Sequence, residues 1–339
     1  MIPKSSAWQA LRAEALNIIP SPTKLYFSTA VPLREWRTRG AYTVPSSDSK
    51  KLVIRASPAV FAEVLFADVE FLLDQAAEQR AALKLAIHDA EWNSPAWTTV
   101  TAYYWSFFSA LALTRIVGRS TWFLNKEEVR YLAALATSVT GKPGAGTMYF
   151  DVEPQTSGDC EMLIAGSGRN NHEAVWHRLH ELVSRIFAAT NRTSAVDEYR
   201  LWWCLAQCAK LLGDSWPSDV RNSVNYKTAY AYTEVTRKPL IKIGPYLRKA
   251  SEMDFKSLLD SFESDVLRLN VPVLRDDLSS LTRLVAANAL ILSQIIEELH
   301  VDVLDRVAGD RRWLRVRNKF LSSRCSADGT KLWPFAGNG

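Results

Sequence analysis

The chain contains 339 residues, 47% of them hydrophobic, and carries a net charge of +5. This apolar content is sufficient for a large buried core, in one large domain or two ordinary ones, and it excludes a disordered chain. Only four cysteines are present, and Cys204 and Cys208 lie one helical turn apart rather than in a zinc-binding pair, so we expect reduced core thiols instead of a disulfide framework.

The basic residues gather toward the two ends of the chain. Residues 1–55 hold nine Lys or Arg against three acidic residues, and residues 301–339 hold eight against four. A clustered positive surface is what a polyanion needs, although solvated faces and loops would carry the same charges. The candidate nucleic-acid-binding residues are Arg34, Arg37, Arg39, Arg311, Arg312, Arg315 and Arg317.

The first half of the chain changes from an extended to a helical pattern. Residues 1–57 are punctuated by prolines and predict an extended arm or a small β element, with strand-like pieces at 24–28 and 51–57. Ser57 and Pro58 suit an N-cap and a first helical residue, and apolar residues at helical spacing continue to residue 90. This predicts one long helix, or two that meet near Gln79.

The next segment predicts the centre of a helical bundle. Ser94 and Pro95 open it, Gly118 closes it, and its middle is apolar on nearly every face. Asn125 and Glu128 have the spacing of a capping box and predict a helix through residue 139. Residues 141–172 carry six glycines and two prolines, which predicts an inserted β-hairpin.

The rest of the chain is predicted to be helical, over 173–190, 194–213, 218–236, 252–270, 274–300 and 303–323. The expected fold is therefore mainly α: a helical bundle with a small Gly-rich β-like insertion and a short β-like or extended N-terminal segment. We expect residues 1–89 to form an N-terminal arm and helix, 90–237 the bundle with its insertion, and 238–339 a C-terminal helical region.

Two patterns that could bind ligands have simple alternatives. The segment "GKPGAGT" (141–147) resembles a phosphate loop, but its lysine precedes the glycines and no helix follows, which favours a turn. On a helix, Glu173, His177 and His180 or Glu181 would share one face and could bind a metal ion, yet a solvated charged stripe would look the same. We therefore predict no cofactor and leave the metal question open.

The segment "RNSVNY" (221–226) follows a Trp-Pro break and predicts the start of a helix. Arg221 can bind a phosphate with two parallel hydrogen bonds, and a helix N-terminus adds N–H groups and partial positive charge. Arg221, Asn222 and Tyr226 are therefore candidate phosphate-binding or catalytic residues. The alternative is an exposed polar helix start with Tyr226 partly buried.

Two segments together resemble the HEPN superfamily, which contains many RNA-cutting toxins and antiviral effectors. "AYYWSFFSALALTRIVG" (102–118) is similar to an early HEPN helix, and "RNSVNY" is similar to a later motif of Arg, a polar residue and then His. The resemblance spans residues 90–237. It implies metal-independent cleavage of RNA in a dimeric site, with Arg stabilising phosphate charge and His moving a proton. Tyr226 stands at the place of that His, so catalytic competence stays open.

The functional prediction has two branches. The first is a cytoplasmic, HEPN-like homodimer of the bacterial defence or toxin–antitoxin kind that binds RNA or nucleotide, with ribonuclease activity an open question. The second is a non-catalytic helical scaffold or regulatory subunit that binds a protein partner. Neither branch involves a membrane, since no secretory signal and no run of about twenty uncharged apolar residues is seen.

Overall fold

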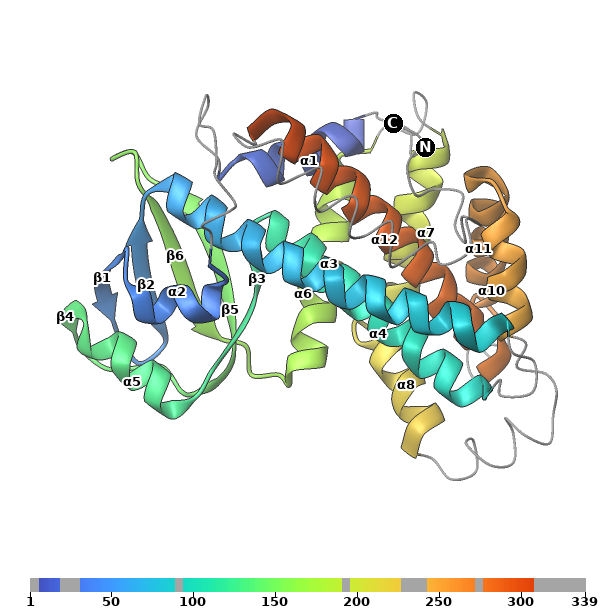
Figure 1. Ribbon diagram of the computed structural model, residues 1–339, viewed down its shortest axis with the longest axis horizontal. Coiled ribbons are helices and arrows are strands. Elements are labelled where there is room, and N and C mark those ends of the chain that lie inside the picture. The colour runs from blue at the N-terminus through green and yellow to red at the C-terminus, as the bar shows by residue number, and fades with distance from the viewer. Residues whose placement is uncertain are drawn as a thin grey trace.

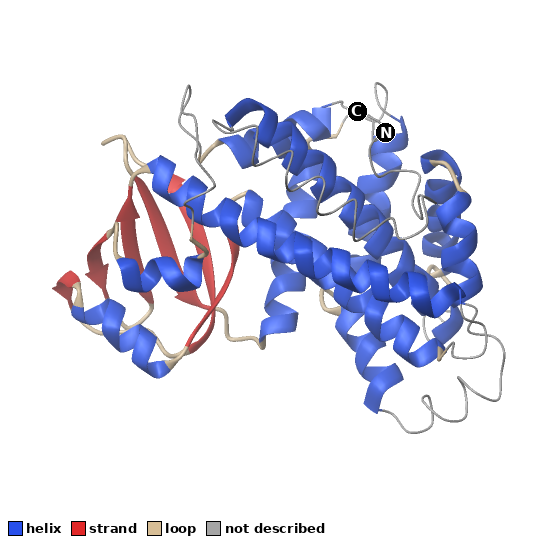
Figure 2. Cartoon of the chain, viewed as in Figure 1, coloured by secondary structure: helices blue, strands red, loops and turns tan. Residues whose placement is uncertain are grey.

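The computed structural model describes residues 6–18, 31–88, 94–190, 196–226, 243–271 and 277–307. Within them the chain forms a helical body with a sheet gathered at one end (Figures 1 and 2). The described residues are 69% helical, so the prediction of a mainly α fold is confirmed. The helices are α1 (Ser6–Leu16), α2 (Leu33–Arg39), α3 (Pro58–His88), α4 (Pro95–Ile116), α5 (Lys126–Ala134), α6 (Asn171–Ala188), α7 (Val196–Leu212), α8 (Trp216–Tyr226), α10 (Ile243–Glu252), α11 (Phe255–Arg268) and α12 (Leu278–Val307).

The sheet has six strands in the order β3-β5-β6-β2-β1-β4, and its pairs are antiparallel except for β1 with β4. Its centre is the pairing of β2 with β6, in which Ile54 lies opposite Met162 and both side chains are fully buried. The strands are β1 (Thr43–Ser47), β2 (Lys51–Ala56), β3 (Arg119–Leu124), β4 (Ala136–Val139), β5 (Gly146–Pro154) and β6 (Cys160–Gly166).

Helix α4 is the centre of the helical body, where it packs against α3, α12, α6 and α8. Ser94 caps it by accepting the Trp97 N–H, and Pro95 occupies its first turn. Gly118 ends it in the left-handed conformation at φ 70°, and a side chain there would meet Ile18 at 3.2 Å. The predicted boundaries of this helix and its central place are confirmed.

Helix α12 is the second core helix. Asn288 on α12 donates a 2.8 Å hydrogen bond to Ser106 on α4, inside the interface between the two helices. By length and composition α12 alone among the described helices could cross a membrane, but 83% of its apolar window is buried inside the protein. Its hydrophobicity is therefore explained by the core that it forms.

The sheet is larger than the sequence patterns predicted. The expected hairpin is present as β5 and β6, and the predicted strand at 51–57 is β2, but β3 and β4 were not predicted. The helix that opens at Asn125 ends at Ala134, so the prediction that it runs to residue 139 is wrong. The sheet combines β1 and β2 with strands beyond residue 89, while the division into three parts stays a prediction.

Other helices also differ from expectation; for example, the segments predicted as separate helices at 274–300 and 303–323 are joined through Val307 in α12. The N-terminal segment is not simply extended, because it contains α1 and α2, while the strand-like piece at 24–28 lies outside the described residues. Pro245 falls between the helices predicted at 218–236 and 252–270, but it lies in the first turn of α10, where a missing N–H costs nothing. Helix α8 begins at Trp216, so "RNSVNY" forms its second and third turns rather than its start.

Candidate functional site

The candidate site lies where α4, the first turn of α6 and α8 meet. Both segments that carry the resemblance to HEPN proteins contribute to it, through Tyr103 and Tyr104 on α4 and Arg221 on α8. Helix α6 adds His172, whose ring centre lies 4.6 Å from that of Phe107 and 5.8 Å from that of Tyr103. We call Tyr103, His172, Ser218 and Arg221 the Arg221 cluster.

Capping at two helices positions the cluster. Asn170 accepts the Glu173 N–H at 3.0 Å, which fixes the start of α6 and places His172 in its first turn. The Ser215 carbonyl accepts the Ser218 N–H at 2.8 Å, which closes the first turn of α8 and directs Ser218 toward α4. The hydrogen bonds at these two helix starts therefore position His172 and Ser218.

Tyr103 is the hub of the Arg221 cluster. Its side chain is fully buried, and its hydroxyl lies 2.7 Å from His172 Nδ1, 2.9 Å from Ser218 Oγ and 3.3 Å from Trp176 Nε1. Trp176 can only donate, so the Tyr103 oxygen accepts from it. Burial raises the pKa of Tyr103, and its hydrogen bonds with Ser218 and Trp176, together with the nearby Arg221, only partly oppose this shift. Tyr103 thus stays a neutral hydroxyl at neutral pH.

Arg221 lies against the two tyrosine rings and is only 8% exposed. Its guanidinium carbon is 5.1 Å from the ring centre of Tyr103 and 5.8 Å from that of Tyr104. Among the described residues, no carboxylate pairs with Arg221 and no acceptor meets its buried Nε. Within the described residues this buried guanidinium therefore lacks a counter-ion, which is costly, and its position suits an anion such as phosphate.

His172 is half-buried beside Arg221. Burial lowers its pKa, and the positive charge of Arg221 lowers it further, so the imidazole is neutral at neutral pH. Nδ1 is held by Tyr103, and no described residue hydrogen-bonds to Nε2. A neutral imidazole with one nitrogen fixed is arranged as a general base or acid is.

The hydroxyl groups of Tyr103 and Ser218 allow His172 to change its tautomer without losing a buried hydrogen bond. If Tyr103 donates to His172 Nδ1, Ser218 donates to Tyr103; if His172 donates from Nδ1, Tyr103 donates to Ser218. In the first case Nε2 carries a proton, and in the second it can accept one. The network therefore supports proton transfer at Nε2 in either direction.

The other residues predicted for this site lie elsewhere on α8. Asn222 is exposed, and the Tyr226 side chain is 70% exposed. Five positions along a helix place Tyr226 about 140° around the axis from Arg221, which agrees with one side chain being buried and the other exposed. No contact within the described residues joins Tyr226 or Asn222 to Arg221. Of the three predicted residues, only Arg221 therefore belongs to the cluster.

Of the predicted basic surface, the structure describes only the N-terminal arginines. Arg34 and Arg39 are exposed on α2, and Arg39 pairs with Glu35 at 3.4 Å. Arg37 is mostly buried in an ion pair with Glu128 and is therefore no free cation. Arg311, Arg312, Arg315 and Arg317 lie outside the described residues, as does Cys325.

The α6 side chains that could bind a metal ion contact other side chains of the protein instead. His177 Nδ1 lies 2.8 Å from Asp214 Oδ2, and His180 Nε2 lies 3.7 Å from Asp214 Oδ1, while Glu173 takes part in neither contact. In the described ranges no three His, Cys, Asp or Glu side chains converge as metal ligands do. Cys160, Cys204 and Cys208 are free and buried, as expected, and burial raises the pKa of all three thiols.

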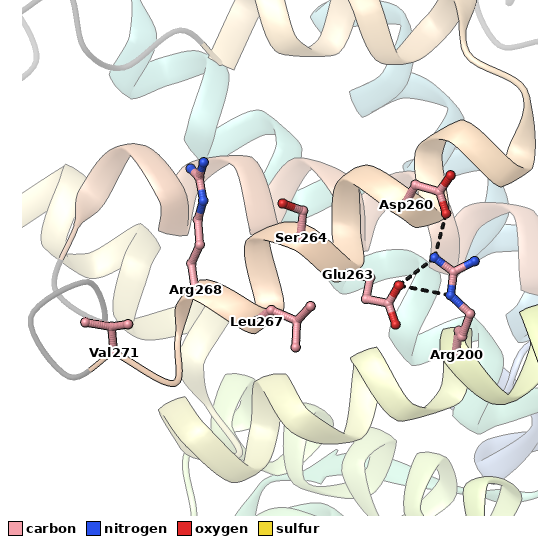
Figure 3. A pocket seen from close by; sticks show the side chains of 7 residues that line it. All are labelled: Arg200, Asp260, Glu263, Ser264, Leu267, Arg268 and Val271. Atoms are coloured by element: carbon pink, nitrogen blue, oxygen red, sulfur yellow. Dashed lines mark hydrogen bonds and ion pairs between the residues drawn. The ribbon is translucent and has the colours of Figure 1, made fainter.

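An open groove of ≈ 550 Å³ lies along α11 (Figure 3). Its main cation, Arg200, reaches from α7 to Asp260 at 2.5 Å and to Glu263 at 2.5 and 2.9 Å. The charges inside this groove neutralise one another, so a charged ligand would have to break existing pairs. The groove is therefore a weaker candidate than the Arg221 cluster.

Comparison of the chain with protein-family models, with curated proteins and with solved structures finds no match. The residues of the site must therefore be interpreted from their own geometry. His172, Tyr103 and Ser218 were not predicted as site residues. The resemblance places the histidine after Arg221 in the sequence, whereas His172 comes from the preceding part of the chain, at the start of α6.

Proposed function

We propose that the protein is a HEPN-like RNA-binding protein that cleaves RNA without a metal ion, with Arg221 and His172 as its catalytic residues. The observation that carries the proposal is a buried arginine with no described carboxylate partner, placed beside a neutral histidine whose Nδ1 is held by Tyr103. The resemblance adds the substrate class and the bacterial defence or toxin–antitoxin setting. The helical bundle centred on α4 is the scaffold that this proposal requires.

In this proposal the RNA strand supplies its own nucleophile. The 2′ oxygen forms a bond to the adjacent phosphorus, and the bond from phosphorus to the 5′ oxygen breaks. His172 Nε2 takes the proton of the 2′ hydroxyl, and water protonates the departing 5′ oxygen. Arg221 stabilises the negative charge on phosphorus-bound oxygens. The products are a 2′,3′-cyclic phosphate and a 5′-hydroxyl end, so Tyr226 is not needed as the proton carrier.

The test compares purified wild-type protein with His172→Ala and Arg221→Ala on a mixed RNA substrate in the presence of a chelator. Loss of a general base or of a charge-stabilising group should reduce the cleavage rate by about 100-fold or more. His177→Ala, on the same helix, and the exposed Arg130→Ala are matched controls that should cleave as the wild type does. The cyclic phosphate ends identify the reaction.

The pH profile and Tyr226→Phe sharpen the test. A base with a lowered pKa stays deprotonated as the pH falls, so cleavage should persist below the pH at which an ordinary histidine loses function. Tyr226→Phe should be without effect. Full activity of His172→Ala, or loss of activity in Tyr226→Phe, would contradict the assignment of His172.

The alternative function is that of a non-catalytic scaffold or regulatory subunit. It is favoured by the full burial of Tyr103 and the near-complete burial of Trp176, which also stabilise the junction of α4, α6 and α8. In that case neither wild-type protein nor Arg221→Ala cleaves RNA or binds it in a salt-sensitive manner. If the wild-type protein bound RNA without cleaving it, and Arg221→Ala lost that binding, the result would support a phosphate-binding site at Arg221 and exclude ribonuclease activity.

A further inference from the structure

A second cavity lies at the sheet end of the molecule, and none of its lining residues belongs to the Arg221 cluster. It has a volume of ≈ 410 Å³ and is lined by α2, α3, the end of α4, β3 and the start of α5. These elements can be followed in Figure 1, where α2 and α5 lie at the sheet end of the long helix α3. A volume of this size is typical of small-molecule sites.

The floor of the cavity is a fixed pair of opposite charges. Arg115 Nε lies 3.4 Å from Asp68 Oδ2, and both side chains are mostly buried. Arg115 also donates from Nη2 to the Thr121 carbonyl at 2.9 Å, and Asp68 accepts the Leu33 N–H at 3.0 Å. The two groups are thus oriented by the fold before any ligand binds, as in preorganised binding sites.

One side of the cavity is built in the same manner. Arg37 pairs with Glu128, and Glu128 in turn accepts the Asn125 N–H at 2.7 Å in the capping box of α5. Arg34, one turn before Arg37 on α2, is exposed and has no acidic partner in the described part of the chain. The lining therefore holds three guanidinium groups against two carboxylates, which leaves one positive charge for a ligand.

Three aromatic side chains also line the cavity. Trp122 is buried, whereas Phe71 is 59% exposed and Phe123 is 61% exposed at the cavity. Aromatic rings of this size are normally placed in the core, and an exposed pair beside a cavity provides faces on which a planar ring can stack. Arginine close to such rings adds a favourable interaction with an anionic or aromatic group.

We propose that this cavity binds a small anion that carries a planar aromatic ring, of the size of a nucleoside monophosphate. The ring stacks on Phe71 and Phe123, and the anionic group is bound by Arg34. The pairs Arg115–Asp68 and Arg37–Glu128 hold the shape of the site, and Arg34 supplies the uncompensated positive charge. This binding is separate from the proposed RNA cleavage, since none of the lining residues belongs to the Arg221 cluster.

The experiment measures binding to the full chain by calorimetry. The probes are the four nucleoside 5′-monophosphates, the corresponding nucleosides, inorganic phosphate and the aromatic carboxylate 4-hydroxybenzoate. Saturable binding of a nucleotide that exceeds both its nucleoside and phosphate supports the proposal. Binding of 4-hydroxybenzoate in place of nucleotides supports the same chemistry and identifies a carboxylate ligand. Equal affinity for phosphate and nucleotide overturns the proposal, because the aromatic ring of the nucleotide then contributes nothing to binding.

Matched variants locate the binding. Arg34→Ala should weaken it about tenfold, which corresponds to one charge-assisted hydrogen bond, and Phe71→Ala with Phe123→Ala should do the same through lost stacking. Arg39→Ala on α2 and Leu85→Ala on α3 are exposed controls outside the cavity and should bind as the wild type does. All these positions are on the surface, so circular dichroism should find the variants folded.

Three results would overturn the proposal. They are no binding of any probe at millimolar concentration, unchanged binding in Arg34→Ala and the double phenylalanine variant, or loss of binding in Arg39→Ala. The variant Arg221→Ala separates this proposal from the RNA-cleaving one. It should bind the nucleotide at the sheet-end cavity normally while it loses cleavage, and loss of nucleotide binding in Arg221→Ala would assign the ligand to the other site.

Discussion

Arg221 and His172 influence each other because a cation and a titratable ring share a partly buried space. Burial is the larger cause of the lowered pKa of His172, and Arg221 is the second. Protonated His172 would place two positive charges beside the Tyr103 ring, which is unfavourable in a site of low polarity. The neutral ring is therefore the form that the native structure selects.

Replacing Arg221 should raise the pKa of His172. In Arg221→Met the neighbouring cation is lost while the burial of the ring is largely kept, so the pKa should move toward the ordinary value for histidine. NMR titration of the imidazole C–H resonances, assigned with His172→Gln, measures it. Arg130→Met, exposed on α5, should leave the titration unchanged. An unchanged pKa in Arg221→Met would contradict the effect of the Arg221 charge on His172.

The same pair affects stability in acid. Because the pKa of His172 is lower in the native than in the unfolded chain, the unfolded chain takes up the proton first as the pH falls. The free energy of unfolding is thus reduced as the pH falls from the ordinary histidine pKa toward the native one, and this loss is complete below the native pKa. In Arg221→Met the acid-dependent loss at this residue should be smaller.

At the scale of elements, sequence patterns predicted what is local and missed what is distant. The capping of α4 by Ser94, the capping box at Asn125 and the closing Gly118 were all predicted, since each depends on residues a few positions apart. The pairing of β2 with β6 joins residues roughly a hundred positions apart, and no periodicity within either segment encodes a partner. His172 was missed for the same reason, because its neighbour Arg221 is distant in sequence.

The central strand pair should stabilise the whole molecule. Ile54 on β2 is fully buried opposite Met162, so Ile54→Ala should lower the free energy of unfolding by about 3 kcal/mol through lost contacts and a cavity. Urea unfolding followed by circular dichroism and by fluorescence measures it, and Lys51→Ala, exposed on the same strand, should change it little. If only one of the two probes shifted, the sheet would be an independently unfolding unit.

At the scale of the whole molecule, one contiguous core joins the sheet and the helical body. Buried residues of β2, β5 and β6 belong to the same cluster as those of α4 and α12. Helix α4 lies between the other helices and reaches β3 directly after Gly118. The Arg221 cluster and the sheet-end cavity both use α4, through Tyr103 near its middle and Arg115 at its end.

Amide hydrogen exchange should identify α12 as one of the most protected helices. Its residues between Leu284 and Ile296 are buried on nearly every side, so their exchange requires global unfolding. Helix α5 is the comparison, because only Val129, Leu132 and Ala133 of it are buried and it should open locally. Exchange in α12 as fast as in α5 would contradict its place in the core.

The order of the strands has a consequence for synthesis of the chain on the ribosome. Helices α3 and α4 follow each other directly and can associate as soon as both have emerged, since their contacts close only a short loop. Strand β2 emerges before them but meets β6 only after about a hundred more residues have been added. During that interval the β1–β2 hairpin has an unpaired edge. A chaperone that shields this edge would therefore increase the yield of folded protein more than one that acts on the helices.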